Sequence, residues 1–466
     1  MERVKLITAR EKKHWTLQEA AKRLEINYNT LYRWEKGLST PRGYNVQRLC
    51  EVYEATTWEL GLEEDGPVTT VAENRQSVPE ETHPFLQADL TMRLLAFAFI
   101  PHRSYQDLQD KMTRMIEEYD AMNTDHHAAV TRRDALRRLA AFPLVTLKLN
   151  ATQPVLHRPP EEILTQCAAS IVACWELSKG NDDGDLSLAF KGASAYLPTL
   201  EAIVMNSSQH RKEAASLAGQ CALLKTMLGW HLEGLKEAAL YAREAITYAR
   251  EANDIPLLLS AVDYLAWAEY YDRRSKQALH DIEQAIPLLM QSKKQGLPLS
   301  TRLQGGVYST LALMQAKNGQ NGVASLRQAA NAFFAPATDE SRFVYMDYTT
   351  SDLVLNDGMV HYHQGDYAKA LDSLSQLIDP ETLALKMPLP ERSRIEGLNM
   401  MTLASLKAKK KDMEHALHIW TEAINGAKTL QSEQRFSEAL TGYEIMEALW
   451  SDEKRITDLR DYIVHW

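Results

Sequence analysis

Residues 16–37 are TLQEAAKRLEINYNTLYRWEKG, a stretch that predicts two short helices joined by a tight turn. Thr16 has the side chain of an N-cap residue, and Glu19 three positions later completes a capping box. The turn falls at residues 25–26, and Asn27 is the expected cap of the second helix. Apolar side chains recur at helical spacing and predict the buried stripes of the two helices; they are Leu17, Ala20, Ala21, Leu24, Leu31 and Trp34.

The second predicted helix turns side chains outward that donate hydrogen bonds to base edges and phosphates; they are Tyr28, Asn29, Thr30, Tyr32 and Arg33. Residues 3–61 resemble the helix-turn-helix domains of the XRE group of bacterial DNA-binding proteins, through the pattern TLQEAAKRLEINYNTLYRWEKGLSTP. The resemblance implies that the second helix enters the major groove, and that Lys36, Ser39 and Thr40 approach the DNA backbone. Leu17 replaces the glutamine with which that family begins its first motif helix.

Charge separates this N-terminal stretch from the rest of the chain. Residues 1–60 hold 11 Lys and Arg against 8 Asp and Glu, a net charge of +3, whereas the whole chain has −10 and the remainder therefore −13. A DNA-binding module needs positive charge locally, not over the whole protein. We expect a homodimer on double-stranded DNA, because two modules double the phosphate contacts. The alternative is a small helical bundle that binds protein or nothing.

Composition narrows the class of protein. Among 466 residues, 45% are hydrophobic and 24% charged, which is ordinary for a soluble globular chain. No run of 18 apolar residues and no signal peptide are found, so we expect a cytoplasmic protein without a membrane partner. The four cysteines lack CxxC spacing, which disfavours zinc and predicts buried thiols. Cys167 and Cys174, seven apart, leave a redox switch as the alternative.

The remainder of the chain contains repeats. Small residues recur in steps of 46 at Ala278, Ala324, Ala370 and Ala416. Twelve positions before each lies a second small residue: Ala266, Ala312, Gly358 and Ala404. Pairs of antiparallel helices that cross closely at these positions would explain the pattern, and such pairs must stack to bury their apolar faces.

These repeats resemble tetratricopeptide repeats, most closely at Gly358, His361, Gly365, Tyr367, Ala370 and Leu374. The expected fold is therefore all-α, with an N-terminal helix-turn-helix bundle followed by an α-solenoid of such helix pairs. The predicted parts are a DNA-binding domain at 1–62, a linker at 63–83, a helical region of uncertain register at 84–208 and the solenoid at 209–466.

Motifs of catalysis are not found in the sequence: it has no GxxxxGK[ST], GxSxG or HExxH, so we expect no enzyme, cofactor or metal site. The first helix of each pair instead lines a concave surface suited to an extended peptide. Its expected lining residues are Trp230, Asp263, Trp267, Tyr270, Tyr271, Asp352, Asn356, Tyr362 and His363.

The combined pattern is similar in architecture to the peptide-pheromone receptors of Gram-positive bacteria, and implies a DNA-binding transcriptional regulator that senses a peptide or protein. The alternative is a repeat scaffold for a protein partner, with a minor or lost DNA-binding role.

Overall fold

The chain is all-α, and the structure, a computed structural model, divides it into two compact units, Met1–Thr82 and His83–Trp466. The described residues are 4–13, 15–24, 26, 28–36, 48–49, 52–53, 55, 60, 62, 90, 92–95, 97, 104–122, 126–149, 159–180, 183–297, 299–335, 345, 348–409 and 411–464. The predicted linker at 63–83 lies outside them.

Helices make up nearly all of the described chain. Their bounds are α1 (Val4–Lys12), α2 (Leu17–Leu24), α3 (Tyr28–Glu35), α6 (Tyr105–Met122), α7 (His126–Leu149), α8 (Pro160–Ser178), α9 (Asp183–Asn206), α10 (Arg211–Leu232), α11 (Leu235–Ala252), α12 (Ile255–Tyr271), α13 (Ser275–Glu283), α14 (Ala285–Lys294), α15 (Thr301–Lys317), α16 (Val323–Phe333), α17 (Thr350–His363), α18 (Tyr367–Leu374), α19 (Glu391–Lys407), α20 (Met413–Thr429), α21 (Glu433–Leu449), α22 (Lys454–Thr457) and α23 (Leu459–Val464).

The N-terminal unit packs α1, α2 and α3 around one apolar core. The capping box of α2 is confirmed: the Thr16 N–H donates to Glu19 Oε2 at 2.9 Å, and the Glu19 N–H donates to Thr16 Oγ1 at 3.2 Å. The predicted cap Asn27 lies outside the described residues. The core side chains include the predicted Ala20, Ala21, Leu24, Leu31 and Trp34, together with Leu6, Leu49, Tyr53 and Leu60.

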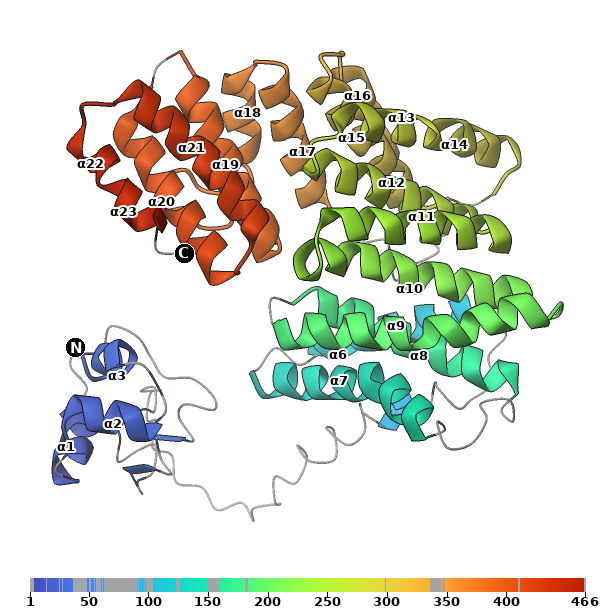
Figure 1. The fold of residues 1–466 in the computed structure, drawn as a ribbon, viewed down its shortest axis with the longest axis horizontal. Coiled ribbons are helices and arrows are strands. Elements are labelled where there is room, and N and C mark those ends of the chain that lie inside the picture. The colour runs from blue at the N-terminus through green and yellow to red at the C-terminus, as the bar shows by residue number, and fades with distance from the viewer. Residues whose placement is uncertain are drawn as a thin grey trace, which may run out of the picture. The chain divides into compact units, whose positions relative to one another are not determined.

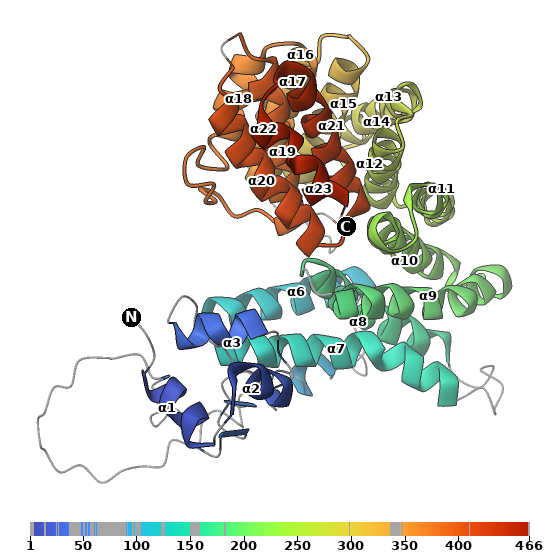
Figure 2. The same cartoon turned by 60° about the vertical axis from the view of Figure 1, so that its left-hand side comes forward.

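The second unit is a stack of helix pairs. Figures 1 and 2 show α10 and α11 between the α6–α9 group and the arc from α12 to α23. The first helices of successive pairs, α10, α12, α15, α17, α19 and α21, each contact the next along this row. One hydrophobic core runs from Leu90 to Ala427, so the α6–α9 group shares it with the repeats. An α-solenoid of helix pairs is thus confirmed.

Small residues mark the helix crossings, with one correction to the predicted register. Seven of the eight predicted small residues are buried, but Ala324 is exposed, so the constant step of 46 is wrong there. Ser325, 7% exposed, packs in its place. In the α15–α16 pair, the buried small residue of the second helix comes 13 positions after Ala312, whereas the predicted spacing was 12.

Ala370→Leu is expected to destabilise the second unit by roughly 1–3 kcal/mol, because the added methyl groups overpack a helix crossing. Ala370 is fully buried, and its carbonyl oxygen faces Gly358 so closely that a Cβ at that position would lie 3.4 Å away. Ala368→Leu, two residues earlier on the exposed face, is the matched control and should have little effect. Urea denaturation compares the two, and equal midpoints would show that Ala370 is not at a crossing.

Candidate functional site

The N-terminal unit holds α3 in place by a buried ion pair. Arg10 on α1 donates to both carboxylate oxygens of Glu35, with Nε–Oε1 2.6 Å and Nη2–Oε2 3.0 Å. A third donor, Nη1, reaches the Trp15 carbonyl at 3.0 Å. Glu35 is 3% exposed, so this fork ties the C-terminal end of α3 to α1 and to the start of α2.

The predicted DNA-contacting residues fall into three groups. Tyr32 is 39% exposed on α3, and the Lys36 ammonium lies 6.0 Å from the centre of its ring. Ser39 and Thr40 lie outside the described residues. Four others lie on α3, but their side chains are also outside the described part; they are Tyr28, Asn29, Thr30 and Arg33.

The first helices of the pairs, which we call the inner helices, bring together a cluster of aromatic side chains. This aromatic cluster consists of Trp230, Tyr264, Trp267, Tyr270, Tyr271, Tyr362 and His363. Trp230 of α10 stacks on Tyr264 of α12, with ring centroids 5.6 Å apart. Within α12, Trp267 lies 5.5 Å from Tyr271. The Tyr270 hydroxyl and His363 Nε2 of α17 are 3.1 Å apart. Six of the nine predicted peptide-lining residues are in this cluster.

A network of charged side chains joins α12, α19 and α21 beside the aromatic cluster. The Tyr271 hydroxyl donates to Glu396 Oε1 at 2.9 Å, and Arg435 Nη2 donates to Glu396 Oε2 at 2.7 Å. Arg435 Nη1 donates to Glu438 at 2.7 Å, while Asn399 donates to the Arg435 carbonyl at 3.0 Å. Helices α12, α19 and α21 are thereby joined across up to 164 residues of sequence.

The other three predicted lining residues have structural partners. Asp352 forms the capping box of α17 with Thr349. Asn356 is 3% exposed, and its Nδ2 donates to Ser309 Oγ at 2.9 Å, so its amide helps to join α17 to α15. Burial raises the pKa of Asp263 to about 7, opposed by its hydrogen bond with Thr310.

Glu396, Asn399 and Arg435 were not predicted from the sequence. Glu396 and Asn399 are three positions apart in the otherwise apolar run Ile395–Met401, where polar side chains need buried partners. That spacing was a usable signal for a polar face toward a neighbouring helix. Arg435 gave no comparable signal, because α21 alternates charged and apolar residues like a solvent-exposed helix.

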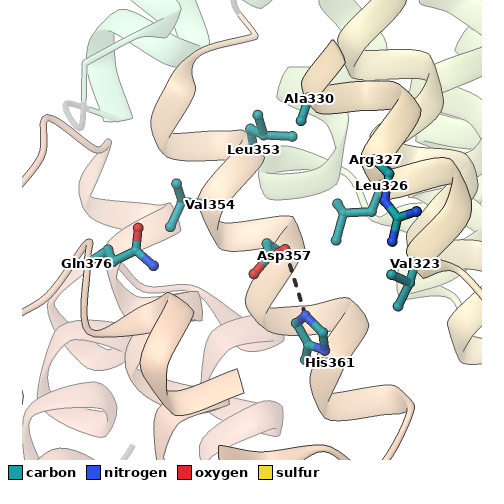
Figure 3. Close-up of a pocket in the computed structure, with 9 residues that line it drawn as sticks. All are labelled: Val323, Leu326, Arg327, Ala330, Leu353, Val354, Asp357, His361 and Gln376. Atoms are coloured by element: carbon teal, nitrogen blue, oxygen red, sulfur yellow. Dashed lines mark ion pairs between the residues drawn. The ribbon is translucent and has the colours of Figure 1, made fainter. Parts of the chain in front are cut away.

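One groove of the second unit shares no residue with the aromatic cluster. A groove of about 360 Å³ between α16, α17 and the residues after α18 is lined by Val323, Leu326, Arg327, Ala330, Leu353, Val354, Asp357, His361 and Gln376. Figure 3 shows Asp357 and His361 facing each other from successive turns of α17, 3.9 Å apart. None of these residues was in the predicted peptide-lining set.

The predicted buried thiols are confirmed for Cys167, Cys174 and Cys221, and burial raises the pKa of the first two. Cys50 lies outside the described residues. In the described part of the chain, no three His, Cys, Asp or Glu side chains gather as a metal ion would require. Over that same part, every helix is too short or too polar to span a membrane.

Comparison with known proteins gives matches to two family models and to solved structures. A helix-turn-helix family model matches residues 6–59. A model of anaphase-promoting complex subunit 5 matches 203–272 and 354–446, both within the solenoid. No curated protein matches significantly. The crystal structure of Bacillus thuringiensis PlcR in complex with the peptide PapR7 and DNA is similar with a TM-score of 0.31 and 12% identity, over 72% of this chain and 95% of that chain. Residues 6–59 therefore form a helix-turn-helix domain of the XRE type, and an α-solenoid of helix pairs follows it.

Proposed function

We propose that this chain is a transcriptional regulator that binds a specific DNA sequence through α3 and a short peptide through the inner face of its solenoid. The observation that carries the DNA-binding half is the helix-turn-helix match over 6–59, together with the packing of α3. Leu31 and Trp34 anchor α3 in the core, while Tyr32 is exposed on it. The net charge of +3 over residues 1–60 favours an anionic partner.

Arg33→Ala is expected to weaken binding to the specific DNA sequence by about 1–3 kcal/mol, because arginine on a recognition helix makes bidentate contacts with guanine. The specific DNA sequence is first identified by selection from random DNA with the full-length protein. Fluorescence anisotropy then gives the affinities of wild type and variant for the selected sequence and for a scrambled one.

Lys12→Ala is the control, since it removes one exposed positive charge from α1. This variant should weaken binding to both DNA sequences about equally and leave the ratio of the two affinities unchanged. If Arg33→Ala also leaves that ratio unchanged in a folded protein, α3 does not read bases. Failure to select any sequence would favour the alternative, a scaffold whose N-terminal unit has lost its DNA-binding role.

Unpaired polar atoms on the inner helices support the peptide-binding half of the proposal. Trp230 Nε1 is buried without an acceptor among the described residues, and Asp263 Oδ1 and Asn399 Oδ1 are likewise without donors. Buried polar atoms are normally hydrogen-bonded, and a peptide backbone has the donors and acceptors that these atoms need, provided that the helices part enough to admit it. The neighbouring rings of Trp267 and Tyr271 offer apolar contact for peptide side chains.

Dimerisation belongs to the same proposal and rests on charge. Residues 1–60, with a net charge of +3, supply few phosphate contacts, and two copies of this segment on one DNA molecule supply twice as many. We expect residues 1–62 alone to bind DNA weakly, because the surfaces for dimerisation lie in the second unit. Tight binding by the isolated segment, comparable with that of the full chain, would count against this arrangement.

A further inference from the structure

Two lysines lie against the aromatic cluster, and the charge of Arg273 acts on one of them; we call Arg273, Lys317 and Lys407 the basic edge. The Lys407 ammonium donates to the Tyr362 hydroxyl at 2.7 Å and lies 4.8 Å from the centre of that ring. The Lys317 ammonium lies 5.7 Å from the ring of Tyr270. Burial, Lys407 and Arg273 together lower the pKa of Lys317, and no carboxylate is among the groups that act on it.

His363 lies beside Tyr270 and Tyr362, and its ring adds no negative charge that could offset the nearby lysines. Burial, Lys317 and Lys407 lower the pKa of His363 to about 3, so its ring is neutral near pH 7. The acids of the nearby network, Glu396 and Glu438, both pair with Arg435. Among the described residues, no carboxylate pairs with the basic edge, which is therefore positive there although residues 61–466 together carry a net charge of −13.

Helix dipoles explain only part of this arrangement. Lys317 and Lys407 are the last residues of α15 and α19, where a cation is favourable. That effect stabilises each lysine separately. It does not account for three cations that repel one another near partly buried rings, because the chain has ample acidic residues that could have paired them. Like charges held together without counterions are typical of an anion-binding site.

We propose that the basic edge binds a carboxylate of the peptide ligand, so that the ligand is an acidic peptide or presents its C-terminus there. This inference rests on the proposed peptide-binding function. Lys317, Lys407 and Arg273 supply the positive donors, and the hydroxyls of Tyr270 and Tyr362 supply neutral ones. Trp267, 5.7 Å from Tyr270, would contact the peptide residue next to the carboxylate.

The test uses pools of random short peptides in two forms, one with a free C-terminal carboxylate and one with a C-terminal amide. Full-length protein retains peptides from each pool, and mass spectrometry identifies them. A terminal carboxylate in the site predicts about tenfold weaker retention of the amide pool. A side-chain carboxylate predicts enrichment of Asp and Glu in both pools. Either outcome supports the proposal.

Lys317→Gln combined with Lys407→Gln should abolish this carboxylate preference while peptides are still retained. Replacement of both residues by Arg should keep the preference, because the charges remain. The control is Lys293→Gln with Lys294→Gln on α14, which removes two exposed charges elsewhere and should leave the preference intact.

The outcomes separate this inference from the function on which it rests. Retained peptides without a carboxylate preference, or with a preference that persists in the Lys317→Gln and Lys407→Gln variant, overturn the basic edge as a carboxylate site and leave peptide binding standing. Retention of no peptide by folded wild-type protein overturns the peptide-binding function, and this inference with it.

Discussion

Arg435→Ala is expected to lower the free energy of unfolding of the second unit by about 3–5 kcal/mol. Arg435 is 6% exposed and donates to both Glu396 and Glu438 at 2.7 Å. Without the guanidinium, the two carboxylates face each other in a site where burial already raises the pKa of Glu438. Urea denaturation of the full chain, followed by circular dichroism, measures the loss.

Arg211→Ala is the matched control for this prediction. Its partner is Glu251, and the two side chains are 53% and 38% exposed, so the change should cost no more than about 1 kcal/mol. Replacement of Arg435, Glu396 and Glu438 together by Leu should recover much of the stability, because no carboxylate of the network then remains without its guanidinium partner. Equal losses in Arg435→Ala and Arg211→Ala would contradict the role given to the network.

Arg10→Ala is expected to unfold the N-terminal unit and to abolish DNA binding while the second unit stays folded. The change leaves Glu35 buried without its partner, at a cost of about 3–5 kcal/mol. A domain of this size has little stability to spare, because small domains bury a smaller fraction of their surface. Limited proteolysis should cut within residues 1–62 of the variant and spare those of the wild type.

Two variants separate the contribution of the bidentate Arg10–Glu35 hydrogen bonds from that of the positive charge of Arg10. Arg10→Lys keeps the charge but cannot form the bidentate contact, so it should be intermediate in protease resistance. Lys12→Ala, on the same helix and exposed, should resemble the wild type. A protease-resistant N-terminal unit in Arg10→Ala would mean that the Arg10–Glu35 pair does not hold α1 to α3.

Local chemistry made much of the fold predictable from the sequence. The capping box of Thr16 and Glu19 depends on residues three apart, and the buried Leu31 and Trp34 depend on helical period; both were confirmed. The helix pairs followed from small residues at a regular spacing. The error at Ala324 arose because a one-residue difference within one repeat is invisible when the steps on either side appear equal.

The structure brings several predicted aromatic residues together, but the sequence did not indicate their hydrogen-bond partners. Trp230, Trp267, Tyr270 and Tyr271 do meet, yet which hydrogen bonds they make depends on how tightly the solenoid curves. Asn356 was expected to be available to a ligand, but it binds Ser309 on the neighbouring helix. Arg435 meets Tyr271 from 164 residues away, a contact that local patterns in the sequence do not encode.

The most direct test of the central claim is the affinity of the full chain for its selected DNA, measured with and without the peptide retained most strongly from the random pool. Coupling between sites is reciprocal, so the DNA should change the peptide affinity by the same factor, about 5–150-fold. Trp230→Phe, which removes the unpaired indole donor, should lose the peptide effect and keep peptide-free DNA binding; Trp450→Phe is its control. Unchanged DNA affinity at saturating peptide would contradict the claim that the solenoid controls DNA binding.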